Sequence, residues 1–251
     1  MIIYLDESYD QLQKRFLLLG LLFCPSKELH KKLTNIHKYN RCLDKSNNII
    51  ETKYNNCFTK HNYNICVQFI NAFIESPDWF SSIIVDLKTT GFDYRFFGKS
   101  QEAKSIKKAR VYKKFTELIV AYNTKHISNA VFLVDEITRC NRDRYMELVR
   151  ERFCPKNDIS DYSVKQNSTF KHVSSTKSNK PENVRLCVCD LLLGCILNNN
   201  LPTKNRWKNK IRKYLIEKLG VKDLLESTWI NINELDSKIT KKYRIWYWKP
   251  K

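Results

Sequence analysis

Three aspartates that are far apart in the sequence occupy positions from which their carboxylates could work together. Asp6 and Asp135 each follow a run of apolar, β-forming residues, so each stands at the end of an expected buried strand. Asp190 is the only acidic residue in the apolar segment 184–197. Buried carboxylates are costly to remove from water, and neighbouring carboxylates raise one another's pKa. A cation with oxygen ligands, Mg²⁺ or Mn²⁺, would relieve this repulsion. The alternative for Asp190 is a structural pairing with a lysine or arginine.

The elements that must position these aspartates indicate an α/β fold. After an opening antiparallel hairpin, strands and helices alternate, which is typical of a mixed sheet with helices on its faces. We predict strands over residues 1–8, 15–23, 79–86, 130–135 and 162–173. We predict helices over residues 26–40, 61–76, 103–123, 142–153 and 182–197, with Ser26 as the N-cap of the first.

The composition favours a globular protein with an anionic partner. The chain has 251 residues, a length that suits one large domain or a domain with an appendage. Its formal net charge of +19 would attract polyanions. A lysine-rich composition from an AT-rich genome is the alternative explanation. With 5 glycines, the sequence has no glycine-rich phosphate loop. The nine cysteines lack zinc-finger spacing and predict free thiols in the cytoplasm. We expect no signal peptide and no membrane association.

Two basic segments are candidates for contact with nucleic acid. One helix expected after residue 200 carries Lys204, Arg206, Lys208, Lys210, Arg212 and Lys213. The other segment precedes the Asp190 helix and carries Lys171, Lys177 and Lys180. Closely spaced lysine and arginine side chains can contact successive backbone phosphates. The alternative is a basic face that contacts only solvent. Trp246 and Trp248 alternate in an expected strand, which favours packing over base stacking. For each of the five histidines we expect a surface position.

Four short motifs, in order along the chain, resemble the prokaryotic family catalogued as domain of unknown function 3800. They are Leu5-Asp6-Glu7-Ser8, Glu51-Thr52-Lys53, Leu133-Val134-Asp135-Glu136 and the segment Leu186-Cys187-Val188-Cys189-Asp190-Leu191-Leu192-Leu193-Gly194. The closing segment 244–248 also resembles the family's last strand. The chain departs from the family pattern at Tyr9, where glycine is usual, at Cys187, where glutamine is usual, and at Cys189, where alanine is usual.

The resemblance implies an RNase H-like mixed β-sheet flanked by helices over residues 1–200. Residues 201–251 would form a basic C-terminal extension that closes with a β-strand packed on the same domain. An RNase H-like nuclease holds two Mg²⁺ or Mn²⁺ ions and cleaves phosphodiesters of DNA or RNA with a metal-activated water. Asp6 would bridge the ions, with Asp135 and Asp190 beside it and Glu51 as a fourth ligand.

The resemblance also leaves roles and functions open. Glu7, Ser8, Lys53 and Glu136 would support the ligands or be structural. Two alternatives to a nuclease remain: a nucleic-acid-binding module with a silent centre, and an effector of an antiviral defence or mobile-element system that needs a protein partner.

Overall fold

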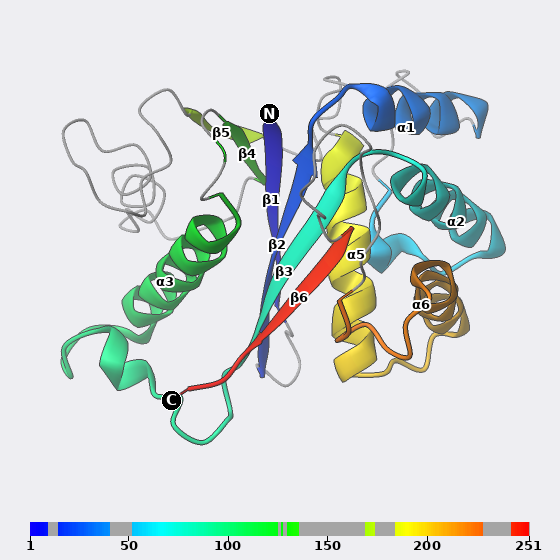
Figure 1. The fold of residues 1–251 in the computed structure, drawn as a ribbon. Helices are drawn as coiled ribbons and strands as arrows, with labels where there is room; N and C mark the ends of the chain where they lie inside the picture. Colours follow the sequence, from blue (N-terminus) through cyan, green and yellow to red (C-terminus); the bar gives the residue numbers. More distant parts are fainter. Residues whose placement is uncertain are drawn as a thin grey trace.

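The protein is an α/β structure in which helices flank a mixed sheet (Figure 1). The computed structural model describes residues 1–9, 15–40, 52–124, 127, 130–135, 169–173, 184–227 and 242–250. The strands are β1 (Ile2–Tyr9), β2 (Phe16–Cys24), β3 (Trp79–Asp86), β4 (Val131–Asp135), β5 (Thr169–Val173) and β6 (Tyr243–Trp248). The helices are α1 (Glu28–Tyr39), α2 (Lys60–Ile74), α3 (Lys104–Thr124), α5 (Val184–Asn200) and α6 (Arg206–Leu219), with short 3₁₀ turns η1 (Tyr54–Asn56) and η2 (Tyr94–Phe97).

The described strands form one sheet in the order β5-β4-β1-β2-β3-β6. Strand β2 pairs antiparallel with both β1 and β3, whereas β4 is parallel to β1 and β5, and β6 is parallel to β3. Strand β2 therefore runs against all its companions. Asp135 is the last residue of β4, as predicted, whereas Asp6 lies within β1, which continues to Tyr9 because Glu7, Ser8 and Tyr9 still pair with β2.

Two hydrophobic cores lie on opposite faces of the sheet. Helices α1, α2, α5 and α6 cover one face, and α3 covers the other (Figure 1). Because successive side chains in a strand point to opposite faces, neighbouring residues join different cores. Tyr4 packs on the α5 side and Leu5 on the α3 side. All nine residues of β2 are buried, which explains why its sequence is continuously apolar rather than alternating.

The predicted elements are confirmed wherever they fall on described residues, with small shifts at their ends. The predicted helix 142–153 and residues 162–168 of the fifth predicted strand lie outside the described residues. The prediction of Ser26 as N-cap is wrong by one position. Helix α1 begins at Glu28, the cap residue is Lys27, and the Ser26 hydroxyl still accepts the Glu28 amide at 3.2 Å. The shift costs little, since Ser26 still satisfies one amide of the first turn.

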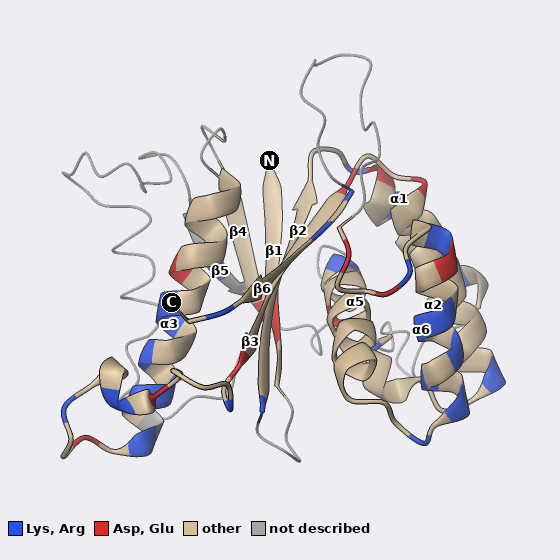
Figure 2. Ribbon diagram, turned by 60° about the horizontal axis from the view of Figure 1, so that its bottom comes forward, with Lys and Arg blue, Asp and Glu red and all other residues tan. Residues whose placement is uncertain are grey.

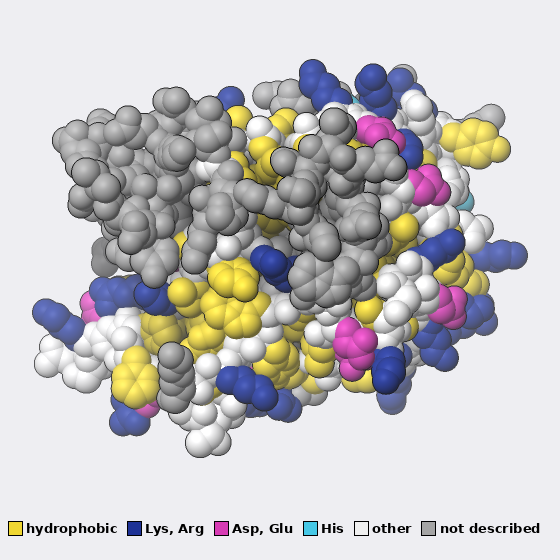
Figure 3. Space-filling view, viewed as in Figure 1, with side chains coloured by type: hydrophobic (Ala, Val, Ile, Leu, Met, Phe, Trp, Pro, Cys, Tyr) yellow, Lys and Arg dark blue, Asp and Glu magenta, His cyan; other side chains and the backbone are white. Residues whose placement is uncertain are grey.

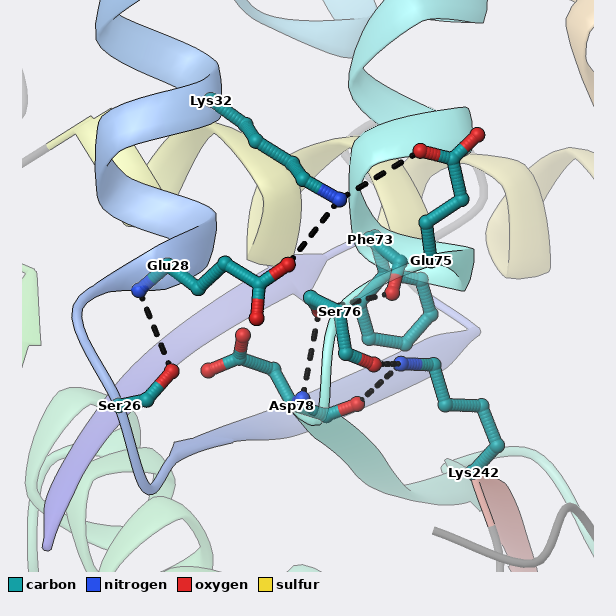
Figure 4. Close-up of polar contacts among 8 residues, drawn as sticks. All are labelled: Ser26, Glu28, Lys32, Phe73, Glu75, Ser76, Asp78 and Lys242. Carbon is teal, nitrogen blue, oxygen red and sulfur yellow. Dashed lines mark hydrogen bonds and ion pairs between the residues drawn. The ribbon is translucent and has the colours of Figure 1, made fainter.

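A buried lysine fixes the beginning of β6 at the end of the sheet remote from the aspartates (Figure 4). Lys242 is almost fully buried, and its ammonium donates to the backbone carbonyls of Ser76 and Asp78. Its Nζ also lies 4.4 Å from the centroid of the Phe73 ring. Burial lowers the pKa of Lys242 to about 8. These contacts join β6 to the turn between α2 and β3. Trp246 and Trp248 then pack on the α3 side, which confirms the packing interpretation.

Candidate active site: a buried carboxylate cluster

Asp6 and Asp135 lie side by side on neighbouring parallel strands. The ladder pairs Leu5 with Val134, and each aspartate is the next residue along its strand. Tyr4 and Leu133, two residues before the aspartates, belong to the core beneath α5. Since side chains two apart share a face, both carboxylates are on the α5 side of the sheet.

Asp190 reaches this pair from α5, and the three acids share one electrostatic field. Asp6 is 6% exposed, and burial raises its pKa well above the usual value, with Asp190 and then Asp135 raising it further. The amide of Glu7 opposes this shift through a hydrogen bond of 2.7 Å to Oδ1 of Asp6. Asp6 is therefore desolvated and is repelled by Asp135 and Asp190, which are themselves only partly buried.

Another strand-end aspartate shows the contrasting, structural arrangement. Asp86 ends β3 and forms an ion pair with Arg15, whose Nη2 lies 2.7 Å from its Oδ2. Hydrogen bonds from Arg15 and from the Lys88 amide hold the pKa of Asp86 below its usual range, against the opposing effect of burial. No ion pair with a lysine or arginine is found for Asp6 among the described residues. Strand-end position alone therefore does not make an aspartate part of the cluster.

Gly20 allows α5 to approach the sheet beside Asp6. It is the residue opposite Asp6 in the β1–β2 ladder. A Cβ at this position would lie 2.9 Å from the Phe80 ring and 3.1 Å from Cδ2 of Leu193, which is three residues beyond Asp190. Only glycine leaves space for this contact, so the close packing that brings Asp190 to Asp6 depends on it.

A second glycine brings the segment after residue 51 against Asp190. Tyr54 donates its backbone amide to Oδ2 of Asp190 at 2.7 Å. Its ring occupies the space next to Gly194, where a Cβ would collide with the Cβ and ring atoms of Tyr54. Burial raises the pKa of the Tyr54 hydroxyl, so it is a neutral packing group rather than a base.

His37 holds the same segment from the other side, which corrects the expectation of a surface histidine. It is completely buried, its Nε2 lies 2.9 Å from Oγ1 of Thr52, and its ring packs on Phe69. The apolar surroundings explain the burial, because residue 37 falls on the inner face of α1 with Leu29 and Leu33. Burial lowers its pKa to about 4. His61, in contrast, is exposed as expected.

A groove of about 570 Å³ begins at Asp190 and leads toward α6. Its lining residues come from the end of β1, from η1, from α5 and from the turn before α6. They are Ser8, Tyr9, Tyr54, Asn55, Asp190, Gly194, Leu197, Asn198, Leu201, Pro202, Thr203, Lys204 and Lys208. Carboxylate therefore lines one part of the groove, and two lysines line another.

Lys208 is the basic side chain most closely integrated with this groove. Its Nζ donates to Oδ1 of Asn55 at 3.2 Å and lies 5.1 Å from the Tyr54 ring centroid and 4.9 Å from that of Phe58. Partial burial lowers its pKa, whereas Cys57 and Asp190 act in the opposite direction. Lys208 thus stays close enough to Asp190 to feel its charge without an ion pair.

Of the remaining basic residues that were predicted to contact nucleic acid, one lines the groove and others lie outside it. Lys204 lines it from the turn before α6, so the prediction that it lies on this helix is wrong, because Asn205 caps the helix and α6 begins at Arg206. Arg206 and Lys210 are exposed on α6 over the Trp207 ring. Lys213 is exposed and Arg212 is half-buried on α6. Lys171 is exposed on β5. Lys177 and Lys180 lie outside the described residues.

The residues predicted to assist the aspartates are also only partly described. Ser8 lines the groove. Glu7 shares the α3 face of the sheet with Leu5 and Tyr9, which lie two residues before and after it. Lys53 directly precedes η1. Glu51 and Glu136 lie outside the described residues.

Sequence reasoning missed the amides that organise the groove. Asn198 is buried, accepts the Thr203 amide at 2.9 Å, and donates to the Lys208 carbonyl and to Oδ1 of Asn209. It therefore fixes the turn that presents Lys204 and Lys208. The run Asn198–Asn200 resembles a solvated helix end, so no sequence signal identifies its first member.

The two cysteines that depart from the family pattern are accommodated in the core. Cys187 and Cys189 are buried free thiols, as are the other described cysteines Cys24, Cys57, Cys66 and Cys195. Burial raises the pKa of the Cys189 thiol, and Asp6, Asp190 and Asp135 raise it further. Cys189 therefore remains a neutral, small apolar group beside the carboxylates.

No ready-made metal cage occurs in the part of the chain that the structure describes: no group of three or more His, Cys, Asp or Glu side chains is arranged to hold an ion. None of the helices in the described ranges is long and apolar enough to cross a membrane. No model of a known protein family matches the chain, and no curated protein matches it either.

Proposed function

We propose that this chain is a Mg²⁺- or Mn²⁺-dependent nuclease with an RNase H-like domain that hydrolyses phosphodiesters of nucleic acid. One observation carries the proposal. Asp6 on β1 lies close enough to Asp135 on the adjacent parallel strand β4 and to Asp190 on the late helix α5 that both raise its pKa. This origin of the acids is the one that the resemblance to the domain of unknown function 3800 implies. The basic composition supports the same substrate class.

The donor set fits a hard divalent cation. All three groups are carboxylates, and the pKa of Asp6 is raised first by burial and then by repulsion from Asp190 and Asp135, costs that a bound cation would offset. Asp6, Asp135 and Asp190 would hold the metal, with Glu51 as a further ligand. Bound metal would supply an activated water and stabilise the leaving oxygen.

The chain's own residues would then hold the substrate beside the acids. Lys204 and Lys208 line the groove that begins at Asp190, so they are positioned to neutralise backbone phosphates. Burial of Asp6 excludes water from its side of the centre, which strengthens electrostatic interactions there. The Tyr54 amide donates to Oδ2 of Asp190 and so helps to fix the orientation of that carboxylate.

The decisive experiment is cleavage of labelled single- and double-stranded DNA and RNA with Mn²⁺ or with EDTA. We expect cleavage by the wild type with Mn²⁺, and none by Asp6→Asn or Asp190→Asn. Asp86→Asn is the matched control, because it changes another strand-end aspartate that lies in an ion pair with Arg15. Loss of activity in all three variants alike, or cleavage by Asp6→Asn at the wild-type rate, would contradict the proposal.

A nucleic-acid-binding module is the second candidate, favoured by the two lysines that line the groove, which can hold backbone phosphates without a metal. This function predicts that the wild type binds oligonucleotides, takes up no Mn²⁺ in calorimetric titration and leaves the strands intact. A protein partner in a defence or mobile-element system remains a prediction from the resemblance, and copurification would test it.

A further inference from the structure

A strongly basic helix lies on the opposite face of the sheet from the groove. The first half of α3 carries Lys104, Lys107, Lys108, Arg110, Lys113 and Lys114. Figure 2 shows basic segments on α3 at one side of the sheet and on α6 at the other, with acidic residues of β1 between them. In the space-filling view, lysine and arginine side chains gather at the lower left and lower right, near the start of α3 and around α6 (Figure 3).

Part of this charge is neutralised within the protein, and part is not. Arg110 forms an ion pair with Glu102, and Lys113 forms one with Glu117. Within the described ranges, no ion pair includes Lys104 or Lys108. These two lysines are four residues apart, so they share a side of the helix, where like charges repel and destabilise it. An anion bound there would remove this cost.

Tyr9 connects Lys108 to the groove. Tyr9 lines the groove, and Nζ of Lys108 lies 5.8 Å from the centroid of its ring, which packs on the α3 side of the sheet. Tyr94 hydrogen-bonds to Tyr9 from the α3 side, and burial together with this contact raises the pKa of Tyr94 to about 12. Tyr9 therefore joins the groove to the start of α3, with its ring on the α3 side. The glycine usual in the resembled family would provide no such link.

We propose that a single nucleic-acid strand in the groove continues past Tyr9 onto the start of α3, where Lys104 and Lys108 neutralise its phosphates. The positive charge of these lysines suits a polyanion. Because Tyr9 joins them to the groove, the polyanion is the same nucleic-acid strand that occupies the groove. Tyr9 then offers an aromatic face between two basic regions, an arrangement suited to stacking a base. The inference rests on the proposed nucleic-acid function and extends its footprint to the second face of the sheet.

The test compares oligonucleotides of two lengths by fluorescence anisotropy in EDTA. Labelled oligo(dT) and oligo(rU) of about 6 nucleotides fill the groove only, and those of about 24 nucleotides also reach α3. The variant is Lys104→Glu with Lys108→Glu, and Lys104→Gln with Lys108→Gln is its milder form. Lys31→Glu with Lys38→Glu on α1 is the matched control, because both lysines are exposed and the net charge changes equally. Thermal unfolding verifies that each variant is folded.

We expect the α3 variant to bind the long oligonucleotide at least about tenfold more weakly, with little change for the short one. The slope of log affinity against log salt should fall by about 1.4, the contribution of two single-strand phosphates. The α1 control should match the wild type. Equal effects of the α3 variant and the α1 control would overturn the inference.

Two further outcomes separate this inference from the proposed function. If the wild type binds oligonucleotides but never cleaves them, the nuclease proposal fails. The proposed α3 contact is then still tested by comparing the long and the short oligonucleotide. If the wild type binds no oligonucleotide, both are overturned. Loss of binding to phosphatidylserine vesicles, with oligonucleotide binding unchanged, would assign the α3 lysines to a membrane and also overturn the inference.

Discussion

The backbone amide of Tyr54 and the Asp190 carboxylate are joined by a hydrogen bond of 2.7 Å across 136 residues of sequence. The bond attaches the segment after residue 51 to the helix that carries the acid. It also restricts rotation of the carboxylate, since one oxygen accepts a fixed donor. Gly194, one turn beyond Asp190, makes the contact possible because it leaves room for the Tyr54 ring.

Gly194→Ala should therefore disturb the site through Tyr54. The added methyl group overlaps the Tyr54 side chain, and an overpacked core typically loses about 1–3 kcal/mol. We expect lower stability in urea unfolding and a larger proportional loss of cleavage, as Asp190 loses its donor. Leu197→Ala, on the same helix and also lining the groove, is the control that removes volume instead of adding it. Wild-type stability and cleavage in Gly194→Ala would show that the segment moves aside at no cost.

The sequence predicts the aspartates of this site because each interrupts or ends an apolar pattern, and such patterns determine which face of a strand or helix is buried. The same reasoning does not reach Tyr54, which acts through its backbone amide, a group that every residue but proline possesses. Asn198 resembles any polar residue at a helix end, and its role depends on a turn that only the three-dimensional structure defines. A single histidine usually lies at the surface, which predicts the same for His37, yet its position on the inner face of α1 buries it.

Asp6→Asn should stabilise the metal-free protein at neutral pH. Burial and neighbouring acids raise the pKa of Asp6, so its contribution is favourable at low pH and is lost as pH rises from the usual value of 3.8 through the raised value. Asparagine removes the charge and keeps an oxygen to accept the Glu7 amide. In EDTA at pH 7.5 we expect a melting temperature higher by about 2–4 °C, equivalent to about 1 kcal/mol at this chain length.

Mn²⁺ should reverse that order, because metal bound to the folded wild type stabilises it and should leave Asp6→Asn unchanged. Calorimetric unfolding with and without Mn²⁺ measures both effects. Asp86→Asn should instead lower the melting temperature under both conditions, since it breaks the ion pair with Arg15. If Mn²⁺ raises the melting temperature of Asp6→Asn and of the wild type equally, Asp6 is not a ligand.

Lys208→Gln should weaken oligonucleotide binding more than Lys213→Gln. Both lysines lie on α6, but Lys208 lines the groove and Lys213 is exposed outside it. Removing one phosphate contact should lower the salt dependence of single-strand binding by about 0.7 in log–log slope. Anisotropy titrations over a range of salt concentrations measure this slope. Equal slopes for the two variants would mean that the basic face of α6, and not the groove, carries the strand.

The stability of the protein should fall between about pH 6.5 and pH 4 because of His37. Burial lowers the pKa of His37 from 6.5 to about 4, so the unfolded chain binds a proton in this range and the folded chain does not. Stability from this group is therefore complete above pH 6.5 and declines as pH falls toward about 4, by about 3 kcal/mol in total. Urea unfolding at pH 7.5, 5.5 and 4.5 should reveal a steeper decline in wild type than in His37→Gln. Carboxylates such as Asp6 titrate in both proteins, so they cancel in the difference. His61→Gln is the control, because that exposed histidine should leave the wild-type profile intact. A profile for His37→Gln that parallels the wild type would show that His37 becomes protonated in the folded state, and that its contact with Thr52 tolerates the charge.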